Sequence, residues 1–282
     1  MQIIRKIFSG LVLFFSFSTL HAQQDSVMYQ RDSAVIPESD PTVLFFQQNE
    51  KVVSQANIRL VTKANKIVSL PDFLSSTGIY ADHVLADLDK DGKKELLISN
   101  YTGGAHCCDE IYVFKNIAPN RYQHVVKFFA GNTMITKYKE FVYNFYEQFG
   151  YFFTCYACAY TDTTDEPPIE LHNILLKYNK GKVTVVPGGK ELRIAILDNL
   201  GKLGEQPYEK LFTGPGGEGD ISQDNGLRKE FAINLAVFFY SFGRNMLETQ
   251  KWFNKYYKYP DAKKVWAAFV KQLQYIRKDN DF

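Results

Sequence analysis

The chain has 282 residues, of which 45% are hydrophobic and 23% are charged, so it can bury a sizeable core and does not have the composition of a disordered chain. Its 33 lysines and arginines nearly balance its 31 aspartates and glutamates, and the basic residues are scattered along the sequence. This distribution argues against a nucleic-acid partner.

The first 22 residues have the pattern of a signal peptide. Arg5 and Lys6 precede an apolar stretch over residues 7–20, and Ala22 provides a small residue at the cleavage position. Serine, threonine and glycine interrupt this stretch, which favours cleavage over a retained membrane anchor. We therefore expect an exported protein, periplasmic or extracellular, without a membrane span after cleavage. Loss of the two basic residues leaves it formally neutral.

Residues 23–41 are polar and lack a period, which predicts a flexible lead-in. Residues 42–189 predict a β-rich domain, because short β-branched and aromatic runs alternate with turn formers. Asn179, Lys180 and Gly181 stand at the reversal of one expected hairpin. The runs are VLFF, NIRLVT, ELLIS, EIYVF, HVVKFF, FVYNFY, YFFTCYACAY, ILLKY and KVTVVP.

Residues 190–282 predict a mostly helical segment. A short helix is expected from residue 190, a loop over residues 214–226, and a further helix from about Asp261, just after Pro260. Between them an apolar stripe with three- and four-residue spacing predicts a buried helix. The stripe consists of Leu227, Phe231, Leu235, Phe238, Phe242 and Met246. The expected fold class is α+β: an antiparallel β-rich domain, with propeller-like hairpins as one form of it, followed by a helical C-terminal segment.

The stretch DLDKDGKKE contains the clearest candidate site. Asp87, Asp89 and Asp91 alternate, Gly92 allows a sharp turn, and Glu95 follows at the ninth position. Carboxylates at this spacing can converge on one cation, and oxygen-only ligands favour calcium over zinc or copper. A solvated acidic turn is the alternative. An EF-hand is excluded, because its twelfth position requires glutamate and this chain has Ile98.

The stretch VLADLDKDGKKELLIS, followed by IYVF, resembles an FG-GAP or VCBS-type repeat, the calcium-loop unit of integrin-like β-propellers. The resemblance covers about residues 80–114 and a single copy. It implies an acidic loop that enters an antiparallel hairpin, with Gly103 to Ala105 in the turn and His106 where the family has proline. By this resemblance the ligands are the side chains of Asp87, Asp89, Asp91 and Glu95 and the carbonyl of Lys93.

Four cysteines in a chain expected to be exported predict disulfides. Three pairings are possible, and bonds between the two segments are favoured because a bond between adjacent residues closes a strained ring. Pairs of Cys107 with Cys158 and of Cys108 with Cys155 suit antiparallel neighbours. Two alternatives remain open: a redox pair in CYAC, and a zinc site formed by His106 with the cysteines.

The usual catalytic spacings are missing from the sequence: it has no GxSxG, HExxH, GxxxxGK or dinucleotide fingerprint. We therefore expect an exported, calcium-binding, non-catalytic protein that binds another protein or an envelope or extracellular polymer. The alternative is a secreted hydrolase of an extracellular polymer in which the calcium is structural. A purely structural envelope protein is a third reading.

Overall fold

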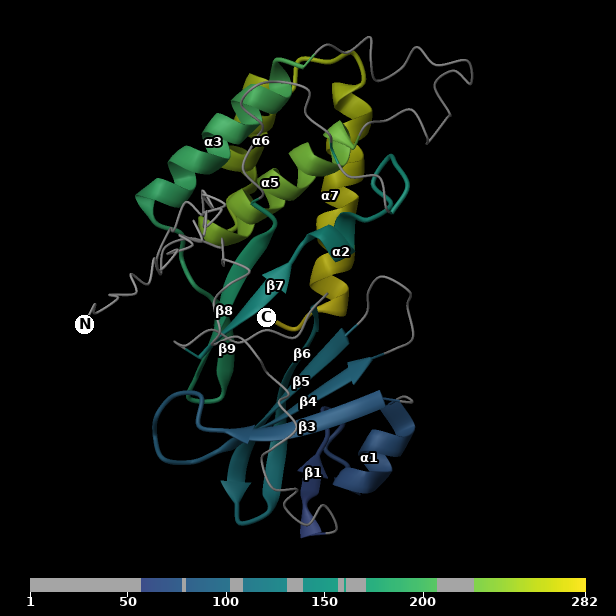
Figure 1. The fold of residues 1–282 in the computed structure, drawn as a ribbon, viewed down its shortest axis with the longest axis vertical. Coiled ribbons are helices and arrows are strands. Elements are labelled where there is room, and N and C mark those ends of the chain that lie inside the picture. Colours follow the sequence, from purple (N-terminus) through teal and green to yellow (C-terminus); the bar gives the residue numbers. More distant parts are fainter. Residues whose placement is uncertain are drawn as a thin grey trace, which may run out of the picture.

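The computed structural model describes residues 57–77, 80–101, 109–130, 139–156, 160, 171–206 and 226–282. The predicted signal peptide and lead-in lie outside these residues. The described chain has an α+β fold, with two sheets and a group of helices that follow one another along the long axis of the molecule (Figure 1).

The first sheet has six strands in the order β2-β1-β6-β5-β4-β3. Its five strand pairs are of two kinds: β1 pairs with β6 in parallel, and the other four pairs are antiparallel. The expected antiparallel pairing therefore holds for four of the five pairs, and the parallel pair arises because the short β1–β2 hairpin adds to the outer edge of the β3–β6 meander. The strands are β1 (Arg59–Val61), β2 (Ile67–Ser69), β3 (Tyr80–Ala86), β4 (Glu95–Tyr101), β5 (Asp109–Ala118) and β6 (Arg121–Ala130).

Both faces of this sheet are covered. Helix α1 (Leu70–Thr77) joins β2 to β3, which are opposite edges of the sheet, and packs on one face. On that face Leu96 and Ile98 pack with α1 in a second, smaller core, whereas Leu97 between them faces the main core. Alternate side chains of a strand point to opposite faces, so a sheet buried on both sides explains the continuous apolar run in β4.

The second sheet is antiparallel, in the order β7-β8-β9, with strands β7 (Glu140–Asn144), β8 (Asn173–Asn179) and β9 (Lys182–Val185). The predicted hairpin turn is confirmed: Asn179 pairs with Lys182, so Lys180 and Gly181 form a two-residue loop. Their φ angles of 48° and 82° are both positive, as a type I′ turn requires.

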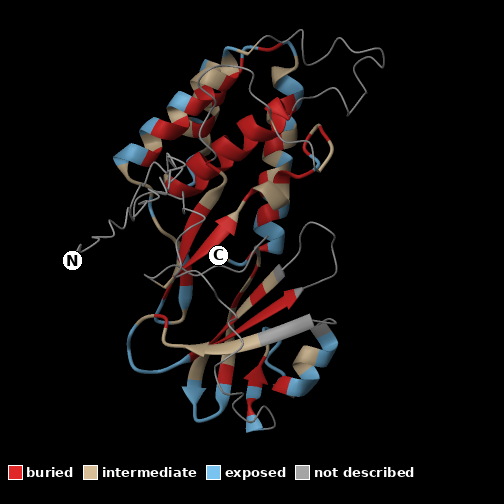
Figure 2. Ribbon diagram, in the orientation of Figure 1, coloured by how far each residue is buried: buried red, intermediate tan, exposed pale blue. Residues whose placement is uncertain are grey.

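A group of helices packs against the second sheet. Every residue of α5 is buried, and buried residues run from it through both sheets in one main core (Figure 2). The predicted stripe continues only to the end of α5, because Gly243 and Arg244 have left-handed φ angles and Met246 begins a separate helix. The helices are α2 (Tyr146–Phe149), α3 (Lys190–Gly204), α5 (Leu227–Ser241), α6 (Met246–Tyr256) and α7 (Ala262–Asp279).

The segment that follows α2 differs from its prediction. YFFTCYACAY was expected to be a strand, whereas residues 151–156 form turns and bends. Phe153 has a φ angle of 56°, which interrupts an extended backbone. The buried Lys229 ammonium binds the carbonyl oxygens of Cys155 at 3.3 Å and Tyr156 at 3.0 Å, so these groups bind a side chain and not a strand.

Candidate metal site

The acidic stretch forms the loop between β3 and β4, and the Asp87 side chain fixes its shape. The Asp87 carboxylate accepts hydrogen bonds from the backbone N–H groups of Asp91 and Gly92, both at 3.1 Å. Gly92 has a φ angle of 85°, and Lys90 has one of 62°. The chain thus curls around its first aspartate, and Gly92 permits the turn for the reason expected from the sequence.

The fold brings three carboxylates together at this loop. One oxygen from each of Asp87, Asp89 and Glu95 lies within 4.8 Å of the others. The strand register explains the meeting, because Glu95 pairs with Ala86 and so enters β4 beside Asp87. Glu95 is only 3% exposed, whereas the two aspartates are half-buried.

The electrostatics of this triad disfavour a third negative charge. Burial raises the pKa of Glu95, and the nearby Asp89 carboxylate raises it further. The Leu88 N–H, which donates to Glu95 at 3.0 Å, opposes the shift. Asp89 Oδ1 is buried and has no hydrogen-bond partner among the described residues. A buried carboxylate oxygen without a partner is costly unless a cation or proton compensates it.

The other two expected ligands lie at the outer side of the loop. Asp91 and Lys93 are exposed, and the Asp91 carboxylate accepts a hydrogen bond from the Lys93 N–H at 2.7 Å. The structure therefore groups three of the five expected residues, and ligation by Asp91 and the Lys93 carbonyl stays a prediction.

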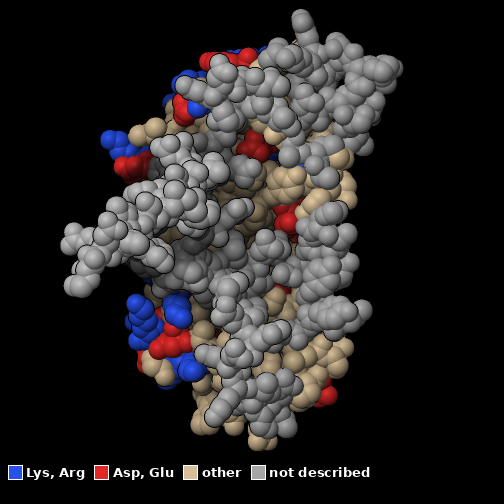
Figure 3. All heavy atoms as spheres, viewed as in Figure 1, with Lys and Arg blue, Asp and Glu red and all other residues tan. Residues whose placement is uncertain are grey.

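The β8–β9 hairpin completes the surroundings of the triad. The Lys180 N–H donates to Asp89 Oδ2 at 3.0 Å, and the buried Tyr178 side chain lies beside Glu95. Burial and the two neighbouring carboxylates raise the pKa of Tyr178, so its hydroxyl stays protonated. Acidic and basic atoms lie together over this loop and turn, at the lower left of Figure 3. The acidic loop thus joins the two sheets.

The cysteines give less information. Cys107, Cys108 and Cys158 lie outside the described residues, as does His106. Cys155, the one cysteine in the described part, is not a free thiol. Its pairing stays a prediction, and the redox and zinc alternatives fall on residues that the structure does not describe.

A second group of buried polar residues was not expected from the sequence. His172 Nε2 lies 2.7 Å from Glu230 Oε2, and the Asn234 amide donates to Glu230 Oε1 at 2.9 Å. The Asn199 amide in turn donates to Asn234 at 3.1 Å, which connects α3 to α5. These hydrogen bonds satisfy polar groups inside the helical core.

Comparison of the chain with models of known protein families, with curated proteins and with solved structures found no match. In the part of the chain that the structure describes, the helices are too short or too polar to cross a membrane.

Proposed function

We propose that this protein is an exported, calcium-binding, non-catalytic binding module, with its ion held by Asp87, Asp89 and Glu95. The observation that supports the proposal is the triad itself, with a buried Asp89 oxygen that has no partner among the described residues. A cation there would compensate this oxygen and the mutual repulsion of the carboxylates.

The dimensions and chemistry of the triad suit calcium. Two oxygens that share one calcium ion at about 2.3–2.6 Å lie at most about 5 Å apart, and the three carboxylates meet this limit. Among the described residues, the metal-ligating side chains gathered at this loop are all carboxylates, with no histidine or cysteine beside them. Asp91 and the Lys93 carbonyl complete the set by the FG-GAP resemblance, which the antiparallel order of β3, β4 and β5 supports.

The ion's proposed role is structural. Because Asp89 contacts the β8–β9 turn and Glu95 contacts Tyr178, a bound cation would strengthen the junction between the two sheets. Calcium would then hold the two sheets in one arrangement and leave the surface available to a protein or an extracellular polymer.

Thermal unfolding with added metal tests the proposal. Calcium at a hundred times its dissociation constant should stabilise the purified protein by about 2.7 kcal/mol if only the folded state binds it. Asp89→Asn should abolish this response, since it removes the charge but keeps an acceptor for the Lys180 N–H. Asp198→Asn, at an exposed residue of α3, is the matched control and should respond like the parent.

A comparison with magnesium completes the test. We expect a smaller response to magnesium, which requires a more regular six-fold geometry. An unchanged melting temperature at about 5 mM calcium, above the weakest dissociation constants of about 1 mM for extracellular calcium modules, would rule out the site.

A further inference from the structure

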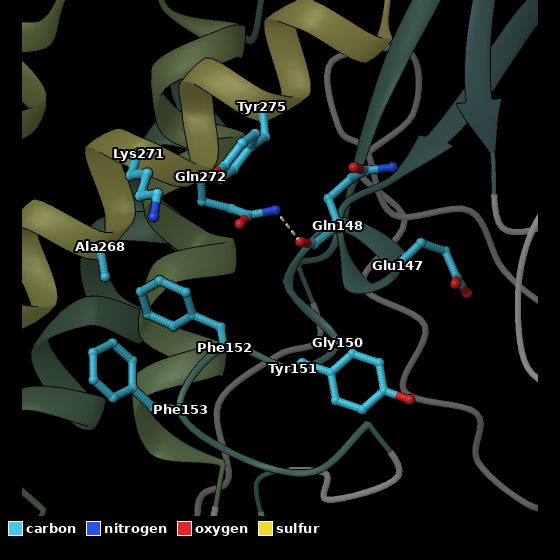
Figure 4. A pocket seen from close by; sticks show the side chains of 10 residues that line it. All are labelled: Glu147, Gln148, Gly150, Tyr151, Phe152, Phe153, Ala268, Lys271, Gln272 and Tyr275. Atoms are coloured by element: carbon cyan, nitrogen blue, oxygen red, sulfur yellow. Dashed lines mark hydrogen bonds between the residues drawn. The ribbon is translucent and has the colours of Figure 1, made fainter.

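A surface pocket of about 450 Å³ lies between α7 and the segment that follows α2 (Figure 4). Tyr151 and Tyr275 stand on its two sides with 80% and 47% of their surface exposed. Phe152 and Phe153 form part of its wall. Its volume falls in the usual range for ligand sites, about 300–1,000 Å³.

The pocket is held in shape from behind. Lys229, 1% exposed, donates to the Tyr146 hydroxyl at 3.1 Å and to the Tyr156 carbonyl at 3.0 Å. The Gln272 amide of α7 donates to the Gln148 carbonyl across the pocket (Figure 4). These contacts hold the aromatic segment against α5 through Lys229 and against α7 through Gln272, so the pocket is preformed.

A row of lysines follows the same side of α7. Lys264, Lys271 and Lys278 are each seven residues apart, so they share one face of the helix at intervals of about 10.5 Å. All three are exposed, and none forms an ion pair with any described residue. Lys271 lines the pocket, and the Lys264 ammonium lies 5.6 Å from the centre of the Phe153 ring.

The surrounding surface is positive as well. Residues 245–282 contain eight lysines and arginines, all exposed, and four aspartates and glutamates. Three of these four carboxylates pair with cations from other parts of the chain. The pairs are Glu248 with Arg193, Asp261 with Arg228, and Asp281 with Lys63.

One carboxylate does line the pocket. Glu147 accepts a hydrogen bond from the Tyr156 hydroxyl at 2.5 Å, and its side chain points away from α7 (Figure 4). It therefore does not neutralise the lysine row, and among the described residues the charge along α7 is positive.

We propose that this pocket and the lysine row bind an acidic polysaccharide. A pyranose ring has an apolar C–H face that packs on a tyrosine ring, and its carboxylate pairs with a lysine at the pocket edge. Lysines about 10.5 Å apart suit a chain that carries one carboxylate on every second sugar. The inference rests on the proposed binding function and names its ligand, but it does not require the calcium ion.

Two other polyanions fit the geometry less well. In a nucleic-acid duplex each strand carries one phosphate charge per about 3.4 Å. This charge spacing is much shorter than the spacing of about 10.5 Å between the lysines of the row. A membrane surface favours apolar side chains that project outward, whereas Phe152 is 8% exposed in the wall of a hollow.

Titration calorimetry tests the proposal with hyaluronate octasaccharide, in which glucuronate alternates with a neutral sugar. A chitin-derived octasaccharide is the neutral control, and a thymidine oligonucleotide and phosphatidylglycerol vesicles represent the other polyanions. We expect binding of hyaluronate that weakens as salt rises. The combined variant Lys264→Gln, Lys271→Gln and Lys278→Gln should bind about tenfold more weakly.

Two further variants separate charge from stacking. Tyr151→Ala should also lower the affinity about tenfold, yet keep the parent's dependence on salt. The matched control Lys251→Gln, Lys255→Gln and Lys258→Gln removes the same charge at exposed lysines on and just after α6, away from the row, and should stay within about twofold. Equal losses in the two lysine triples would overturn the proposal, as would tighter binding of the oligonucleotide or the vesicles.

The same titrations in calcium and in EDTA distinguish the two proposals. If hyaluronate binds in EDTA while the protein shows no calcium-dependent stabilisation, the calcium site is refuted and the pocket stands. If calcium stabilises the protein but hyaluronate does not bind, the pocket assignment is refuted alone.

Discussion

Lys229 is the residue whose burial has the clearest energetic consequence. Its ammonium is enclosed by carbonyl and hydroxyl oxygens of residues 146–156. Lys229→Met keeps the apolar stem but leaves those acceptors without their donor, so we expect the free energy of unfolding to fall by about 1–3 kcal/mol. Urea unfolding measures the loss.

The exposed Lys271 provides the matched control for this measurement. Lys271→Met should change the free energy of unfolding by at most about 0.5 kcal/mol, as for most surface substitutions. Equal effects at the two positions would show that the contacts of Lys229 contribute nothing to stability.

His124 predicts a dependence of stability on pH. Burial lowers its pKa below the usual 6.5; the charges of Lys63 and Lys127 act in the same direction, and that of Asp281 opposes them. The unfolded chain therefore takes up this proton at a higher pH than the folded chain, so the group's contribution is full above about pH 6.5 and declines as the pH falls below it.

Urea unfolding at several pH values between about 5 and 7.5 checks this prediction. In His124→Gln the free energy of unfolding should fall less with decreasing pH than in the parent. Asp281 and the lysines remain in both proteins, so the difference between the two curves isolates the histidine. Parallel curves would contradict the assignment.

The sequence predicted the carboxylates of the triad but not the residues that pack against them. Asp87, Asp89 and Glu95 lie within nine residues, so their spacing and Gly92 were enough to predict a shared site. Tyr178 and Lys180 lie about ninety residues further along the chain, and only the packing of the two sheets brings them there. No local spacing records such a contact.

Alanine substitutions at two glycines near the end of α3 should change the stability in opposite directions. A Cβ at Gly201 would lie 3.7 Å from the Tyr256 ring, an ordinary contact, so Gly201→Ala should raise the free energy of unfolding by about 0.5–1 kcal/mol. A Cβ at Gly204 would collide with the backbone carbonyl of Tyr256, so Gly204→Ala should lower it by at least about 1 kcal/mol.

Thermal and urea unfolding of the two alanine variants provide the comparison, since each serves as the other's control. Both changes favour a helix by the same intrinsic propensity, so only the approach of α6 distinguishes them. Stabilisation by both would mean that α6 does not pack this closely on the last turn of α3.

Elements with a strong local signal were predicted best. The β8–β9 hairpin follows from Lys180 and Gly181, and the start of α7 follows from Pro260 and Asp261. The turns at residues 151–156 were missed because backbone carbonyls there bind Lys229 from a distant helix instead of pairing with a strand. The parallel β1–β6 pair was missed because strand order depends on tertiary packing.

At the scale of the whole molecule, the C-terminal residues connect the helices to the six-stranded sheet. The Asn280 side chain accepts from the Phe129 N–H at 2.8 Å, and the Asp281 N–H donates to the Lys127 carbonyl at 3.0 Å. The Phe282 ring lies 4.9 Å from the Tyr143 ring of the second sheet. One short segment thus contacts both sheets.

The main core also crosses the boundary that composition suggested near residue 189. It includes Leu97 and Phe128 from the first sheet, Leu176 from the second, and Phe238 and Phe269 from the helices. The change from strands to helices along the sequence is real, but the two parts bury their apolar faces against each other. We therefore expect them to unfold together.

Asn280 provides the test of this cooperativity. It is 4% exposed, so Asn280→Ala leaves the half-buried Phe129 N–H without its acceptor and should cost about 1–3 kcal/mol. Fluorescence of Trp252 and Trp266 reports on the helices, and hydrogen exchange of β4 and β5 amides reports on the first sheet. In Asn280→Ala the two probes should report the same decrease in the free energy of unfolding. Asp279→Ala, at the exposed neighbouring residue, should change neither value. If the sheet amides kept their protection while the fluorescence transition moved, the six-stranded sheet would be an independent unit and the shared core would contribute little to its stability.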